Sequence, residues 1–87
     1  MIYARRSDTL PGGAVRWDLS DPYNTEGTEV RAIITQVAGL LGHTLVYGVQ
    51  ANGVPKLITH YTTTDPAEAL IRHGFVVQHS LYEGVNP

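Results

Sequence analysis

Histidine is the side chain in this sequence best suited to proton transfer near neutral pH, and the chain contains four of them. His43 and His73 each follow an apolar, helix-like run. A cationic side chain is favoured at a helix C-terminus, so both have a structural explanation. His60 and His79 fall in expected strands instead, and they could face one ligand. The candidate ligand pocket consists of Trp17, Tyr47, His60 and His79.

The familiar catalytic and cofactor motifs are missing from the sequence. The chain has no cysteine, which excludes a thiolate nucleophile and a zinc–thiolate site. No histidine pair has HExxH spacing, and no serine lies in a G-x-S-x-G turn. The turn at Pro11-Gly12-Gly13 lacks the lysine and the following helix of a phosphate loop. We therefore expect no metal, no cofactor and no catalytic residue.

Composition narrows the class of protein further. The 87 residues suffice for one domain, residues 1–87, and 43% of them are hydrophobic, as in globular proteins. Only 16% are charged and the net charge is −2, with Arg5 and Arg6 the only adjacent basic pair. Nucleic acid is held by clustered Lys and Arg, so such binding is disfavoured. No signal peptide or membrane span is visible, and we expect a cytoplasmic protein.

The middle of the chain, residues 32–55, contains no Asp, Glu, Lys or Arg. Apolar residues at positions 30, 33, 34, 37, 40 and 41 have helical spacing and predict a helix over residues 28–41. Its second face would be small and neutral, unlike the usual solvated face. Both faces of the following hairpin would also be apolar. These faces are either buried within the monomer or form an interface. The predicted interface residues are Ala32, Thr35, Gln36, Gly39, Val46, Leu57 and Tyr61.

The other expected strands and a second helix, taken together with this segment, predict the fold class. Strands are expected at residues 1–6, 14–19, 44–51, 54–62 and 75–82, with Trp17 as a core anchor. Asn52-Gly53 predicts a hairpin turn that pairs Leu45 with His60. Asp65-Pro66 begins a second helix that ends at Gly74. Together these elements predict an α+β domain: one antiparallel-rich sheet with two helices on one face, in a ferredoxin-like βαββαβ plan with an extra N-terminal strand.

The function that this sequence favours is non-catalytic protein binding. A small domain without a catalytic motif suits an accessory or inhibitory factor that acts on a larger macromolecule, and a phage-encoded inhibitor would be one instance. Its partner would be another protein, a second copy of itself, or both. One alternative is an enzymatic or small-molecule-binding homodimer that uses His60 and His79. A second is nucleic-acid binding through an open sheet face that bears Arg16, Tyr61 and Tyr82.

Overall fold

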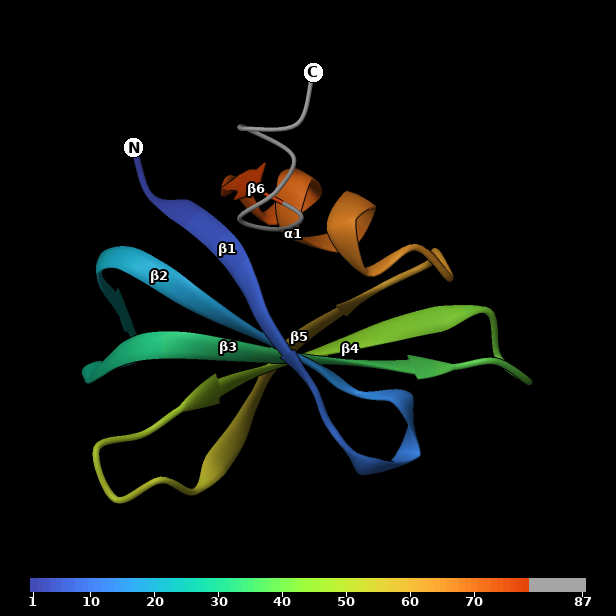
Figure 1. Ribbon diagram of the computed structural model, residues 1–87, viewed down its shortest axis with the longest axis horizontal. Coiled ribbons are helices and arrows are strands. Elements are labelled where there is room, and N and C mark those ends of the chain that lie inside the picture. The colour runs from blue at the N-terminus through green and yellow to red at the C-terminus, as the bar shows by residue number, and fades with distance from the viewer. Residues whose placement is uncertain (79–87) are drawn as a thin grey trace.

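The computed structural model describes residues 1–78, which form one six-stranded sheet with a single α-helix on one side (Figure 1). The strands lie in the order β5-β4-β3-β2-β1-β6. All neighbours are antiparallel except β1 and β6, which are parallel. The elements are β1 (Tyr3–Thr9), a 3-10 turn (Pro11–Gly13), β2 (Val15–Thr25), β3 (Thr28–Ala38), β4 (His43–Val49), β5 (Pro55–Tyr61), α1 (Pro66–His73) and β6 (Val76–Gln78).

The two-helix ferredoxin-like plan is wrong, because residues 28–38 form strand β3 and not a helix. Glu26 and Gly27 both have positive φ, the backbone of a tight two-residue hairpin turn that returns the chain along β2. The register of β2 against β3 shifts between Asp18 and Tyr23. With this shift Val30 and Ile33, three residues apart, both reach the core. That spacing imitates a helix, while the many β-branched residues of β3 favour a strand.

The second hairpin confirms the predicted turn but not all of its predicted pairing. Gly53 has positive φ, and the Val54 amide donates to Asn52 Oδ1 over 3.0 Å. Leu45 pairs with His60 as predicted. A register shift then places Leu57 opposite Tyr47. Uninterrupted pairing from the Asn52-Gly53 turn would place Leu57 on the same face as Val46, but the shift turns Leu57 to the other side of the sheet.

Helix α1 begins and ends as its sequence predicts. Asp65 accepts a hydrogen bond from the Ala67 amide over 3.0 Å, and Gly74 adopts the left-handed conformation of a C-cap. Ala67, Ala69 and Leu70 are buried against the sheet. The apolar side chain next to Leu70, Ile71, is 58% exposed.

The hydrophobic core lies between α1 and one face of the sheet, here called the inner face. Trp17 is its largest buried side chain, as expected for a core anchor, and its indole Nε1 donates to Thr35 Oγ1 over 2.9 Å. No buried side-chain nitrogen or oxygen atom among the described residues lacks a hydrogen-bond partner. The main members of the core are Ala4, Val15, Trp17, Val30, Ile33, Val46, Leu70 and Phe75.

Candidate functional site

The face of the sheet that points away from α1, here called the outer face, carries a continuous group of apolar side chains. Strand alternation places these residues opposite to the buried Thr35, Val46 and Gly48. Tyr47 lies at the centre, paired with Ile34 on β3 and Leu57 on β5. Leu57 is 53% exposed. Within residues 1–78 no helix lies over this group. We call it the outer patch: Ile34, Leu45, Tyr47, Val49 and Leu57.

Charged side chains border the outer patch on the β2–β3 side and are largely paired with one another. Arg16 Nε lies 3.2 Å from Asp18 Oδ1, and Arg31 lies 3.0 Å from Glu29 Oε1. Arg16, Glu29 and Arg31 line an open depression of about 390 Å³. Val49 of the outer patch also lines this depression. Arg16 does occupy the open sheet face, as the nucleic-acid alternative requires, but its guanidinium is already bound to a carboxylate.

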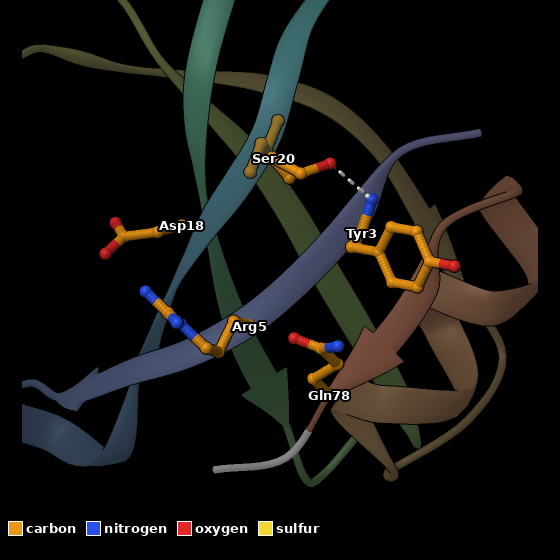
Figure 2. A pocket seen from close by; sticks show the side chains of 6 residues that line it. Tyr3, Arg5, Asp18, Ser20 and Gln78 are labelled. Atoms are coloured by element: carbon orange, nitrogen blue, oxygen red, sulfur yellow. Dashed lines mark hydrogen bonds between the residues drawn. The ribbon is translucent and has the colours of Figure 1, made fainter. Parts of the chain in front are cut away.

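A polar depression of about 180 Å³ lies beside this region, near the end of the described chain (Figure 2). The Tyr3 amide donates to Ser20 Oγ over 2.9 Å at its upper rim. The Arg5 side chain extends toward Asp18, and Gln78 lies on its other side (Figure 2). This depression offers hydrogen-bonding groups to a polar side chain of a partner. Its lining contains no histidine, and no pair of groups arranged for proton transfer.

The predicted ligand pocket is not assembled from its described members. Trp17 is buried in the inner core, whereas Tyr47 and His60 lie on the outer face. His60 instead stacks on His43, with ring centroids 5.1 Å apart and an interplanar angle of 25°. His79 lies outside the described residues. Residues 1–78 contain no group of three or more His, Asp or Glu side chains placed to hold a metal ion.

Apart from Met1, the most exposed of the large apolar residues lie in the turn between β3 and β4, at the right-hand end of the molecule in Figure 1. The side chain of Leu40 is fully exposed and that of Leu41 is 71% exposed. The Leu41 amide donates to the Ala38 carbonyl and the Gly42 amide to the Gly39 carbonyl, over 3.1 and 3.2 Å. The turn is therefore hydrogen-bonded, and it presents two adjacent leucines to solvent. We call Leu40 and Leu41 the leucine tip.

Sequence reasoning missed the leucine tip because it assigned both leucines to the apolar face of a helix. The signal that could have located it is the pair of glycines around them. Gly39 and Gly42 bracket Leu40-Leu41, and Gly42 adopts a positive φ of 67°. Glycines spaced in this way are typical of a turn between strands.

A histidine–tyrosine cluster joins α1 to the sheet on the inner side. His73 Nε2 lies 2.8 Å from the Tyr23 hydroxyl, and His73 Nδ1 lies 2.7 Å from the Tyr61 hydroxyl. In a neutral imidazole one of these nitrogens donates and the other accepts. Burial lowers the pKa of His73, which favours the neutral ring over the cation expected at a helix end. Both ring nitrogens are occupied, so the imidazole has no free lone pair for a ligand, and the cluster holds the helix to the sheet.

The seven predicted interface residues are divided among four places in the structure. Thr35 and Val46 are buried on the inner face, and Tyr61 belongs to the histidine–tyrosine cluster. Ala32, Gln36 and Leu57 lie on the outer face, and Gly39 lies beside the leucine tip.

Comparison with protein-family models, with curated proteins and with solved structures finds no match to this chain. Within residues 1–78, no helix has the length and apolar character needed to cross a membrane.

Proposed function

We propose that this protein is a non-catalytic protein-binding module and that the leucine tip is the part that enters its partner. It would act in the cytoplasm as an accessory or inhibitory factor on a larger protein. The observation that carries the proposal is the exposure of two adjacent leucines on a hydrogen-bonded turn. Fully burying a leucine side chain is worth about 1.5–3 kcal/mol, so two such residues are strong anchors for a partner pocket.

The structure of the turn favours binding in a second way. An ordered loop loses less conformational entropy on binding than a flexible one. The hydrogen bonds from the Leu41 and Gly42 amides hold the turn in place before any partner arrives. Ordering the turn backbone therefore does not offset the free energy gained from burying the leucines.

The surroundings of the leucine tip favour an apolar protein pocket over lipid or nucleic acid. Residues 32–55 contain no Lys or Arg, so the strands and the turn that carry the tip offer no basic side chain from this segment to a phosphate. Residues 32–55 contain no Asp or Glu either, so they offer no negative charge that would favour a basic pocket on the partner. A neutral hydrophobic pocket on a protein is the complementary surface.

The proposal is tested by capture with matched variants. The tagged protein, the double variant Leu40→Ser/Leu41→Ser and the control Ile71→Ser are each incubated with lysate of the source organism. Ile71 is 58% exposed, but it lies on α1, away from the tip. We expect a protein that the wild type and Ile71→Ser both retain and that the double variant loses. Equal retention by all three proteins, or retention of nothing specific, would overturn the proposal.

Co-sedimentation with neutral phosphatidylcholine vesicles distinguishes a lipid target from a protein target. We expect the wild type to stay in the supernatant. Sedimentation that the double variant abolishes would assign the leucine tip to lipid and contradict the proposal.

A further inference from the structure

We infer that His43 and His60 form a binding site for one divalent transition-metal ion of the Zn²⁺, Ni²⁺ and Cu²⁺ class, and that the bound ion joins the edge strand β5 to β4. The rings of the two histidines lie side by side, with their centroids 5.1 Å apart. This inference rests on these two side chains and does not depend on the leucine tip.

The register of the β4–β5 pair brings the two histidines together. Leu45 of β4 pairs with His60 of β5, and His43 lies two residues before Leu45, on the same face of β4. His43 and His60 are therefore diagonal neighbours across the two strands, a relation in which long side chains reach one another. The register shift of this pair lies between Val46 and Tyr47, so this end of the hairpin keeps its regular pairing.

Both rings are accessible to a ligand. His60 is exposed and His43 is half-buried. Within residues 1–78, no hydrogen bond or ion pair engages a ring nitrogen of either histidine. His73 differs, because two tyrosine hydroxyls occupy both of its ring nitrogens. In the described part of the chain the pair thus presents nitrogens with no protein partner, and neutral imidazole is the commonest metal ligand.

The spacing of the rings fits a shared metal ion. Two imidazoles that bind one tetrahedral ion through bonds of about 2.05 Å have ring centroids about 5.2 Å apart, since each centroid lies roughly 1.2 Å behind its bonded nitrogen. The observed separation is 5.1 Å. The rings are stacked at an interplanar angle of 25°, so each must turn about χ2 to aim a nitrogen at the common point. That torsion is broad in histidine, and within residues 1–78 no hydrogen bond fixes either ring.

The surroundings of the pair select the class of ion. From residue 32 to residue 62 the only charged side chain is Lys56, whose amine lies 3.9 Å from Glu26 Oε2. This segment therefore offers no carboxylate of the kind that binds Mg²⁺ and Ca²⁺. Imidazole nitrogen suits Zn²⁺, Ni²⁺ and Cu²⁺ instead. Because the pair supplies two ligands, we expect weaker binding than in a structural zinc site with four.

The bound ion stabilises the pairing of an edge strand. Within residues 1–78, β5 is hydrogen-bonded to one neighbour in the sheet, β4. The two histidines come from these two strands and lie together only while the strands are paired. The ion therefore binds the paired state better than the separated one and shifts the local equilibrium toward pairing. Zn²⁺ should consequently slow the amide exchange of β5.

Isothermal titration calorimetry of the untagged protein with ZnCl₂ and NiCl₂, from about 10 µM to about 2 mM ion, tests the site over the range of weak affinities. The informative variants are His43→Gln and His60→Gln, and the matched control is His79→Gln, which removes a histidine outside the pair. We expect the wild type and the control to bind one ion per chain with equal dissociation constants. Each informative variant should raise this constant at least about tenfold, because one imidazole alone cannot chelate the ion. MgCl₂ should give no binding.

Three results of the titration would overturn the inference. The first is a wild type that binds neither ion up to about 2 mM. The second is an unchanged dissociation constant in both His43→Gln and His60→Gln, because separate single histidines would then account for the binding. The third is a loss of affinity in His79→Gln as large as in the informative variants.

Two measurements on the wild type do not depend on how the variants fold. In NMR spectra, the ring signals of His43 and His60 should shift with one common dissociation constant as Zn²⁺ is added, and those of His73 should not shift. Amide exchange in β5 should be slower in saturating Zn²⁺ than in the same concentration of Mg²⁺. Shifts confined to one of the two rings would overturn the shared site, and equal exchange rates would overturn the joining of β5 to β4. None of these outcomes alters the capture result for the leucine tip, so the two proposals fail independently.

Discussion

At the scale of single residues, Gly48 shows how closely the inner face of the sheet is packed. A Cβ atom at this position would lie 2.8 Å from Val30 Cγ1 and 2.9 Å from Ile58 Cδ1. Ile58 can turn its terminal methyl aside. Val30 is only 2% exposed, and its Cγ1 can move only by rotation about χ1, which is restricted in a β-branched side chain. Glycine is therefore required here by the space available on β4.

We predict that Gly48→Ala destabilises the protein by about 1–3 kcal/mol, the usual effect of overpacking a core. The matched control is Gly39→Ala, because a Cβ there meets nothing within 4 Å. We expect the control to change the free energy of unfolding by less than about 0.5 kcal/mol. Urea unfolding of both variants measures the difference. Equal stability of the two variants would show that Val30 and Ile58 can move apart.

At the scale of elements, α1 is held to the sheet by its C-terminal residue as well as by its apolar face. Tyr23 comes from β2 and Tyr61 from the end of β5, and both bind the ring of His73. Phe75 adds an aromatic contact, with its ring centroid 5.6 Å from that of His73. A helix of eight residues is marginal alone, so these contacts help to keep it in place.

The cluster makes stability depend on pH, and the sign follows from the pKa of His73. Burial lowers this pKa below the ordinary value of 6.5. Between the two values the unfolded chain binds more protons than the folded one, so stability rises with pH. The contribution is complete above about pH 6.5 and is lost as the pH falls through the folded-state pKa. We expect the free energy of unfolding to decrease from pH 7.5 to pH 5.

The variant His73→Gln isolates this effect, because the other three histidines are present in both proteins. Its free energy of unfolding should decrease less than that of the wild type over the same pH range. Glu68 does not interfere: the Thr63 hydroxyl, and then Arg72, lower its pKa below 4.5, so it titrates at lower pH. Parallel pH profiles for the two proteins would contradict a role for the His73 ring.

At the scale of the whole molecule, the sheet order places the most stable backbone in the middle of the sequence. Strand β3 has hydrogen-bonded neighbours on both sides and contains Ile33 and Thr35 of the buried core. Strand β5 lies at one edge, and within residues 1–78 strand β6 pairs with β1 over three residues. Opening the protein at β3 requires loss of most of the core, whereas β5 can separate locally.

We therefore predict that amide hydrogen exchange is slowest in β2, β3 and β4. Exchange in β5 and β6 should be faster, because their amides open without global unfolding. Mass spectrometry of exchanged peptides, compared with the unfolded chain, measures this order. If β5 exchanged as slowly as β3, then an additional surface would have to protect that edge.

The sequence alone determined the features that depend on a few neighbouring residues. The Asn52-Gly53 turn, the Asp65 cap, the Gly74 end of α1 and the core position of Trp17 all follow from local chemistry and alternation. Each requires only a backbone conformation or a hydrogen bond within reach along the chain.

Only the tertiary structure decided whether residues 28–41 form a helix and which way β5 faces. The apolar residues of this segment fit both periods, and pairing of β3 with β2 and β4 selects the strand. The same pairing turns Leu40 and Leu41 into a tip and places the outer patch on the face opposite α1, where Leu57 is 53% exposed. These outcomes depend on hydrogen bonds between strands and on one-residue register shifts. Such shifts reverse a side chain's face without leaving a periodic signal in the sequence.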